Sequence, residues 1–230
     1  MSTADRIDLR KELNRALQDL TWNVKGILLN DGKVMAVPPE SRVVTAILHV
    51  VAMDIVRTYG RSIGLAVEDF PYETRGYPDM ALSDGPLGKK VIALDIKTAR
   101  YLGDDKVSRM TLGTYDGYFL HPKEKRLHGG TKCYHDYDEH WVAGIIYEWH
   151  PDKGTDEMVR VKECIVGQKW QVASKTSGSG DTANIGGIDS LEALRSLQNV
   201  FTNEEEFEEY WRDYAIRHPR KRTRLPQRDD

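Results

Sequence analysis

Apolar residues recur at helical spacing in four segments of the chain. In residues 5–20 and 204–218 the apolar positions form a single stripe between charged residues, which predicts two amphipathic helices. In residues 41–58 apolar side chains cover most of the helical circumference, which predicts a buried helix that ends at Gly60. Residues 190–197 predict a shorter helix.

Extended segments lie between these helices. Residues 24–29 and 33–37, joined by Asn30-Asp31-Gly32, predict a β-hairpin. Residues 177–180 contain too many glycines for the interior of an element and predict a loop. The mixture of helices and strands predicts an α/β or α+β fold with one central mixed sheet. The strands expected in that sheet are residues 64–68, 79–82, 90–98, 141–149 and 158–171.

Length and composition narrow the class of protein. A chain of 230 residues with 40% hydrophobic and 30% charged residues suits a single globular domain, residues 1–230. Its two cysteines, Cys133 and Cys164, cannot form a disulfide scaffold and fit a reducing compartment. We expect no membrane partner, because no run is judged long and apolar enough to span a bilayer and the N-terminus has no signal pattern.

The formal charge of −3 does not exclude nucleic acid as a partner. What matters for such a partner is a local basic surface, and residues 217–230 form a basic tail that is broken by prolines. This tail is a candidate for contacts with phosphates, and the alternative is that it only aids solubility.

Two short motifs carry the strongest chemical signal. Asp79 follows Tyr77-Pro78, and Asp95-Ile96-Lys97 lies on the strand predicted over residues 90–98. Side chains alternate along a strand, so Asp95 and Lys97 share one face, while the apolar residues between them face the core. A turn between the two segments would bring Asp79 and Asp95 together. Two carboxylates repel each other unless a cation offsets their charge, and Mg²⁺ prefers oxygen ligands.

This pattern is the PD-(D/E)xK nuclease signature. In such a site we expect Lys97 to orient the attacking water and to stabilise charge on the phosphate, in preference to acting as a general base. The signature is degenerate. The same residues also fit a surface Pro-Asp turn and an ordinary strand ion pair between Asp95 and Lys97.

Further residues strengthen the nuclease interpretation. The chain resembles the EcoRV family of type II restriction endonucleases over nearly its whole length, and the matching blocks occur in the same order with similar spacing. These blocks are Tyr77-Pro78-Asp79, Asp95-Ile96-Lys97-Thr98, Thr111-Leu112-Gly113, His140-Trp141 with Gly144, Lys169-Trp170, Gly178-Ser179-Gly180, Asn184-Ile185-Gly186 and Tyr210-Trp211-Arg212 with Tyr214.

The resemblance implies an activity and a set of partners. It implies a homodimer in the prokaryotic cytoplasm that hydrolyses double-stranded DNA at a short palindrome and leaves 5′-phosphate ends. It implies Mg²⁺ held by Asp79, Asp95 and the Ile96 carbonyl, with Lys97 beside the attacking water. It also implies a cognate DNA methyltransferase that acts on the same site.

The resemblance further divides the chain by role. Residues 24–37 would form the dimerisation hairpin, residues 73–100 the catalytic region and residues 177–187 the loop that reads DNA. The residues expected to contact DNA are Glu73, Thr74, Arg75, Thr98, Arg100, Gly178, Ser179, Gly180, Asp181, Thr182 and Asn184.

The chain also departs from the family pattern. His49 occupies a position where the family has an acidic residue, and imidazole is a weaker ligand for Mg²⁺ than carboxylate. We therefore expect His49 to be a helix histidine packed near the site. Asp181 replaces an asparagine in the recognition loop, and an ionised carboxylate can only accept hydrogen bonds, for example from cytosine N4. The target of a relative therefore does not transfer to this chain.

Two other functions fit the same signature. A DNA repair or junction-resolving nuclease would cut structured or damaged DNA without a fixed palindrome. A DNA-binding module that has lost catalysis would lack Asp79, Asp95 or Lys97, and all three residues are present.

Overall fold

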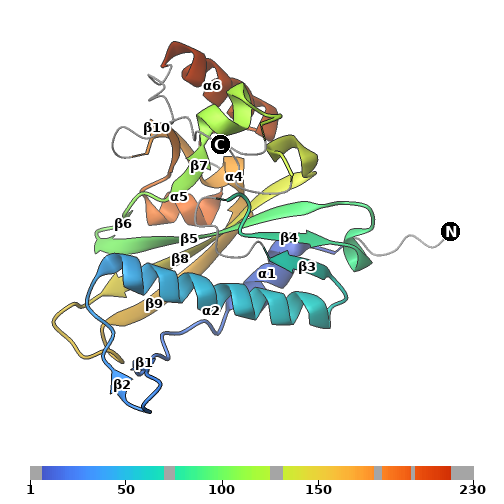
Figure 1. Cartoon of the computed structure of the whole chain (residues 1–230). Coiled ribbons are helices and arrows are strands. Elements are labelled where there is room, and N and C mark those ends of the chain that lie inside the picture. Colours follow the sequence, from blue (N-terminus) through green and yellow to red (C-terminus); the bar gives the residue numbers. More distant parts are fainter. Residues whose placement is uncertain (1–6, 70–75, 125–131, 179–182, 198–199, 219–230) are drawn as a thin grey trace, which may run out of the picture.

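A mixed β-sheet forms the centre of the fold (Figure 1). The computed structural model describes residues 7–69, 76–124, 132–178, 183–197 and 200–218. Within them, six strands form the central sheet in the order β3-β4-β5-β8-β9, with β6 paired to β5. Only the β5–β8 pair is parallel among the described pairs of this sheet, so the mixed sheet predicted from the sequence is confirmed. The strands are β3 (Ala66–Asp69), β4 (Met80–Ser83), β5 (Ile92–Gly103), β6 (Lys106–Val107), β8 (Glu139–Trp149) and β9 (Val159–Gln168).

Helices cover both faces of this sheet, and each face has its own hydrophobic core. On one face lie α1 (Leu9–Leu17) and the long helix α2 (Ser41–Ser62). Figure 1 shows α6 (Glu204–Arg217) on the opposite side, above a second sheet. That sheet has the order β10-β11-β7, which the sequence did not predict. The remaining elements there are α4 (Lys169–Val172), α5 (Leu191–Ser196), β7 (Thr111–Thr114), β10 (Ala173–Ser177) and β11 (Asn184–Gly187).

The predicted N-terminal hairpin is present but short. β1 (Ile27–Leu28) pairs antiparallel with β2 (Val34–Met35). In Figure 1 this hairpin projects from the body of the molecule, below the N-terminal end of α2. The predicted strands, residues 24–29 and 33–37, include the observed ones but are longer.

The end of the predicted strand over residues 158–171 is wrong. β9 stops at Gln168, and the chain turns into α4 at Lys169. The Gln171 side chain caps this turn, because its Oε1 accepts a hydrogen bond from the Gln168 N–H at 2.9 Å. A lysine expected on a strand therefore begins a helical turn.

The predicted end of the long helix at Gly60 is also wrong. Helix α2 continues to Ser62, and the left-handed residue is Gly64, with φ of +86°. The Leu65 N–H donates to the Gly60 carbonyl at 2.9 Å, and the Gly64 N–H donates to the Arg61 carbonyl at 3.1 Å. This hydrogen-bond pair closes a helix end of the Schellman type, in which glycine adopts the positive φ without steric cost.

Helix α2 also corrects the expectation about apolar runs. Within the described residues it is the one helix long and apolar enough to cross a membrane by length and composition alone. It is a core helix, because Val44, Leu48, Ala52 and Val56 pack into the core that it shares with the central sheet.

Helix α6 begins at Glu204, as predicted, and Asn203 caps it. The Asn203 side chain accepts a hydrogen bond from the Glu206 N–H at 2.8 Å. The Glu206 carboxylate accepts from the N–H and hydroxyl of Thr202, not from Asn203. Phe207 and Trp211 are fully buried on the inner face of the helix, which anchors α6 to the core.

A half-buried glutamate, Glu204, in the first turn of α6 gives a testable dependence of stability on pH. Burial, together with the nearby carboxylates of Glu208 and Glu139, raises the pKa of Glu204 to about 7. The folded state therefore holds this proton more tightly than the unfolded state, and the free energy of unfolding falls as pH rises from 4.5 towards 7. We expect Glu204→Gln to raise the free energy of unfolding at alkaline pH by about 1–2 kcal/mol, and to give no gain in acid.

Urea denaturation at one pH well above and one well below the pKa of Glu204 measures this difference. Glu205→Gln, which neutralises an exposed neighbour, is the control. An equal gain for Glu204→Gln at both pH values would contradict the burial argument.

Candidate active site

The β4–β5 pairing brings the two aspartates together. Met80 pairs with Leu94 and Ala81 with Ala93, so Asp79 lies opposite Asp95 in the next pair of this register. The turn between the two strands, predicted from the sequence, therefore places both carboxylates at one end of the hairpin.

The predicted division of faces on β5 is confirmed. Ile92, Leu94 and Ile96 point into the core shared with α2. Ala93 faces the opposite core, and Asp95 and Lys97 follow it on that face. Asp95 is only 2% exposed, so its carboxylate needs charged or polar partners within the protein.

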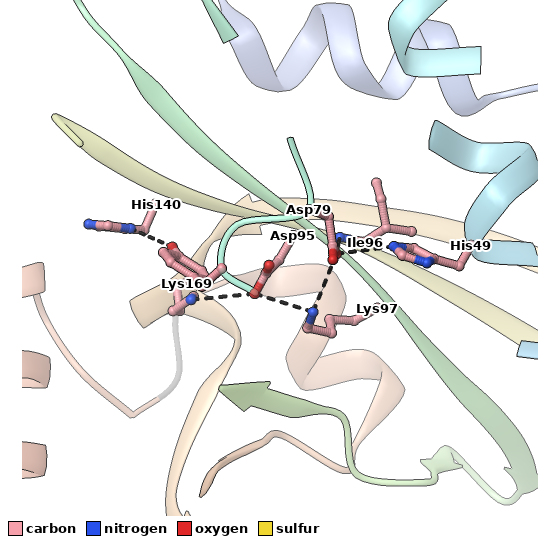
Figure 2. A network of polar contacts seen from close by, with 8 residues as sticks. His49, Asp79, Asp95, Ile96, Lys97, His140 and Lys169 are labelled. Atoms are coloured by element: carbon pink, nitrogen blue, oxygen red, sulfur yellow. Dashed lines mark hydrogen bonds and ion pairs between the residues drawn. The ribbon is translucent and has the colours of Figure 1, made fainter. Parts of the chain in front are cut away.

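Charged side chains form a row across this end of the hairpin (Figure 2). Lys97 Nζ lies 3.5 Å from Asp79 Oδ2 and 3.3 Å from Asp95 Oδ2. On the other side of Asp95, Lys169 Nζ lies 3.5 Å from the same Asp95 oxygen. On the far side of Asp79, His49 Nε2 lies 3.2 Å from Asp79 Oδ2. Basic and acidic side chains therefore alternate along the row.

The row changes the protonation of its members. Burial opposes the charge of Asp79, but Lys97, His49 and the Ile96 N–H outweigh it and hold the pKa of the Asp79 carboxyl well below its usual range. Burial likewise opposes the charge of Lys97, but Asp79 and Asp95 raise the pKa of Lys97 well above its usual value. Lys97 is therefore an ammonium group in this structure, which suits it to donate hydrogen bonds.

Lys169 belongs to this site, although the sequence did not assign it a role. Its side chain is 1% exposed, and burial lowers the pKa of Lys169 to about 8 against the opposing attraction of Asp95. The signal available in the sequence was its place in the block Lys169-Trp170. Because a strand was predicted over residues 158–171, the helical turn that directs Lys169 towards the carboxylates was not foreseen.

His49 lies where the sequence placed it, packed beside the site on α2. It also lines an open groove of about 380 Å³ that leads to Lys97. Most of the other lining side chains are cationic or carry hydroxyl groups, and several come from α2 and β7, which the sequence did not connect with the site. The groove is lined by Arg42, Thr45, Ala46, His49, Ile96, Lys97, Thr98, Arg109 and Thr111.

The residues predicted to contact DNA divide into three groups. Thr98 lines the groove, whereas Arg100 lies with its guanidinium 5.4 Å from the centre of the Trp149 ring and outside the row of charges. Gly178 and Asn184 lie at the two ends of the loop predicted to read DNA, and the Gly178 N–H donates to the Asn184 carbonyl at 2.7 Å. The others lie outside the described residues: Glu73, Thr74, Arg75, Ser179, Gly180, Asp181 and Thr182, together with nearly all of the basic tail.

A family model described as restriction endonuclease EcoRV matches residues 18–227 of the chain. The chain belongs to the EcoRV family of restriction endonucleases. It is similar to the type II restriction enzyme EcoRV of Escherichia coli, with 27% identity over 224 residues that cover 90% of this chain and 89% of that enzyme. Its fold is similar to that of the NlaIV restriction endonuclease, with a TM-score of 0.53 and 13% identity, covering 91% of this chain and 80% of that one.

Membership of this family establishes the class of reaction. The chain is a type II restriction endonuclease, a hydrolase of phosphodiester bonds that cleaves double-stranded DNA at specific sites. Nucleases of this family typically depend on a metal ion.

The donor set at this site suits a hard cation. Asp79 and Asp95 each place an oxygen within 3.5 Å of the single Lys97 nitrogen, so both carboxylates can approach one positive charge. Within the described ranges, no three His, Cys, Asp or Glu side chains are arranged to share an ion. Two carboxylates with few other protein ligands match Mg²⁺, which keeps several of its waters.

Proposed function

We propose that this endonuclease cleaves a short palindromic DNA duplex as a homodimer, in a Mg²⁺-dependent reaction centred on Asp79, Asp95 and Lys97. The observation that carries the proposal is that both carboxylates lie within 3.5 Å of the Lys97 ammonium. In this assignment Asp79, Asp95 and the Ile96 carbonyl hold the ion. When bound, Mg²⁺ supplies positive charge that offsets the negative charge growing on the phosphate oxygens.

The side chains of the protein have separate tasks in the hydrolysis. Lys97 orients the attacking water and donates hydrogen bonds to the phosphate oxygens as their charge grows. The water oxygen bonds to phosphorus as the bond from phosphorus to the 3′ oxygen breaks. The products are then a 5′-phosphate and a 3′-hydroxyl that has taken up a proton. Asp79 is kept ionised by Lys97 and His49, so it is ready to bind the ion.

The groove beside Lys97 fits the backbone of DNA. Arg42 and Arg109 supply positive charge, and Thr98 and Thr111 supply hydroxyl groups, whereas the Thr45 hydroxyl donates to the Arg42 carbonyl at 3.2 Å. Such groups contact phosphates without reading sequence, so they fix the position of the duplex relative to the site. The tail, residues 217–230, would add phosphate contacts.

Base recognition is assigned to the loop in residues 177–187. Its described ends are tied to the second sheet, because Ser177 pairs with Ile185 and Asn184 pairs with Thr114. A loop anchored in this way can present its residues to the major groove. We propose that Asp181 accepts a hydrogen bond from an amino-bearing base, cytosine in preference to adenine, so that the target differs from that of relatives with asparagine there.

A homodimer is supported by the exposed hairpin. Leu28 is 73% exposed and Val34 is 61% exposed, and both are apolar residues on β1 and β2. A protein with two-fold symmetry matches the two-fold symmetry of a palindrome. A methyltransferase that modifies the same site is expected as a companion enzyme, without direct contact.

Cleavage of plasmid DNA tests the function. With Mg²⁺ the purified protein is expected to convert mixed plasmids into discrete fragments, and excess chelator should abolish cutting because the ion's charge stabilisation is lost. Ligation of the fragments checks for 5′-phosphate ends. A smear of products, or preferential cutting of junctions and mismatched duplexes, would instead indicate a repair or junction-resolving nuclease.

A further inference from the structure

Lys169 is the least expected member of the charged row. It begins α4, and its side chain is 1% exposed. Lysine is almost never fully buried unless it is paired. Its ion-pair partner is Asp95, at 3.5 Å, and that carboxylate is itself 3% exposed. A buried ammonium group thus lies directly behind a buried carboxylate that we assign to the metal.

Aromatic rings complete the surroundings of this ammonium. Lys169 Nζ lies 3.8 Å from the centre of the Tyr77 ring, 4.8 Å from that of Tyr118 and 5.4 Å from that of Tyr134. Ring faces attract cations, and the attraction is stronger where water is excluded. The three tyrosines, together with Asp95, therefore form a box that suits a positive charge.

The box is built into the fold at several points. Tyr77 Oη lies 2.5 Å from His140 Nδ1, and the His140 ring stacks on Tyr134 with centres 3.7 Å apart. Gly113 has φ of +95°, and a Cβ there would lie 1.9 Å from Tyr118 Oη, so only glycine leaves room for that tyrosine. Packing and hydrogen bonds thus fix the rings before any ion or DNA arrives.

Lys169 connects the two segments that carry the carboxylates. It contacts Asp95 directly, and it contacts the ring of Tyr77, two residues before Asp79. The charges also balance, because the carboxylates of Asp79 and Asp95 stand against the ammonium groups of Lys97 and Lys169. A divalent ion that enters alone would leave an excess of positive charge, whereas a DNA phosphate that enters with it would reduce that excess.

We propose that Lys169 is a positioning residue of the nuclease site, a fixed counter-ion that holds Asp95 and the Tyr77–Asp79 segment in place and couples ion binding to DNA binding. This inference rests on the proposed function, in which Asp79 and Asp95 bind the metal. Lys169 acts through those carboxylates and not on the phosphate.

The test replaces Lys169 with methionine, which keeps the length of the side chain and removes its charge. The affinity of the DNA-free protein for Mn²⁺ is measured by electron paramagnetic resonance of the free ion. The dissociation constant is expected to fall about tenfold, because one opposing charge is gone. Single-turnover cleavage at saturating Mg²⁺ is expected to slow by about 10–100-fold, because the carboxylates lose their support. Lys90→Met, which removes a half-exposed lysine paired with Glu139, is the control and should leave Mn²⁺ affinity unchanged.

Tighter binding of the ion with slower cleavage is the signature that a purely structural role would not produce. Unchanged or weaker Mn²⁺ binding by Lys169→Met would overturn the proposal, and so would cleavage at the normal rate. Should Lys169→Met fail to fold, the double variant Asp95→Asn with Lys169→Met restores the charge balance and is expected to fold. A double variant no more stable than the single one would also overturn the proposal.

Failure of the proposed function gives a different result. If the unmodified protein showed no Mg²⁺-dependent cleavage, the function would fail at that step. The Mn²⁺ titration of the DNA-free protein would still report whether Lys169 opposes ion binding at the two carboxylates.

Discussion

Asp79→Asn and Asp95→Asn are each expected to lose Mg²⁺-dependent cleavage by about 10²–10⁴-fold. The substitution keeps the shape of the side chain and removes one of the two charges assigned to the ion. Stabilisation of transition-state charge by a metal amounts to several kcal/mol, and each 1.36 kcal/mol changes the rate about tenfold. Single-turnover rates on a cognate duplex at saturating Mg²⁺ measure the loss.

The two substitutions are also expected to lower the free energy of unfolding. Two carboxylates that only repelled each other would give the opposite result, because removal of one charge would relieve the repulsion. Lys97 lies between the aspartates, and Lys169 lies behind Asp95. Removal of either aspartate therefore leaves lysine ammonium groups without a counter-charge and does not simply relieve repulsion. We expect both variants to remain folded. The loss in the free energy of unfolding should reach about 3–5 kcal/mol for Asp95→Asn, the range measured when one partner of a buried pair is removed. It should be smaller for Asp79→Asn, because the Asp79 side chain is 17% exposed.

A matched control separates the site from the overall charge. Asp54→Asn removes an exposed carboxylate on α2 that pairs with Arg57, and it should cut DNA at the normal rate. Near-normal cleavage by Asp79→Asn or Asp95→Asn would refute the two-aspartate assignment. All rates should be compared well below the unfolding temperature of the least stable variant.

The part of the site that sequence could predict is the part that depends on local periodicity. Alternation along a strand placed Asp95 and Lys97 on one face, and the turn after β4 brought Asp79 beside them. These relations involve residues close together in the chain. A single strand pair with a fixed register is enough to establish them.

The missing part depends on contacts between distant segments. The box around Lys169 draws on Tyr77, Tyr118 and Tyr134, which come from three separate stretches of the chain. Arg42 on α2 and Arg109 beside β7 line the same groove as Lys97 on β5, although they are far from one another in the chain. No periodicity in one segment encodes such meetings, since they arise from the packing of helices and the second sheet against the central one.

Errors in the predicted elements have a similar origin. Glycine at position 60 predicts a helix end there. Instead, the Gly60 carbonyl accepts a hydrogen bond from the Leu65 N–H, and the left-handed residue that closes the helix is Gly64. Lys169 falls in a segment with strand character, yet the capping side chain of Gln171 turns the chain there. In both cases a hydrogen bond at the end of an element overrides the pattern of the residues within it.

The double substitution Leu28→Asp, Val34→Asp is expected to separate the proposed dimer and to abolish cutting of both DNA strands. These side chains are 73% and 61% exposed on a short two-stranded hairpin that projects from the body of the protein (Figure 1). Two-stranded hairpins are marginal in isolation, and exposed apolar side chains gathered on one feature commonly mark an interaction site. Each substitution occurs twice in a symmetric dimer, so the charges would repel across the interface.

The expected result is a rise of at least about 10³-fold in the dimer dissociation constant, because central apolar contacts each contribute about 2 kcal/mol or more. Sedimentation velocity measures the change in assembly, and plasmid cleavage below the new dissociation constant should give uncut DNA. Lys33→Ala in the same turn, where Lys33 is 80% exposed and pairs with Asp31, is the control and should leave the dimer intact. A Leu28→Asp, Val34→Asp protein that stays dimeric and cuts both strands would assign the interface to another surface. A monomer that still cuts both strands would refute the need for a dimer, because a single active site faces only one strand of a palindrome at a time.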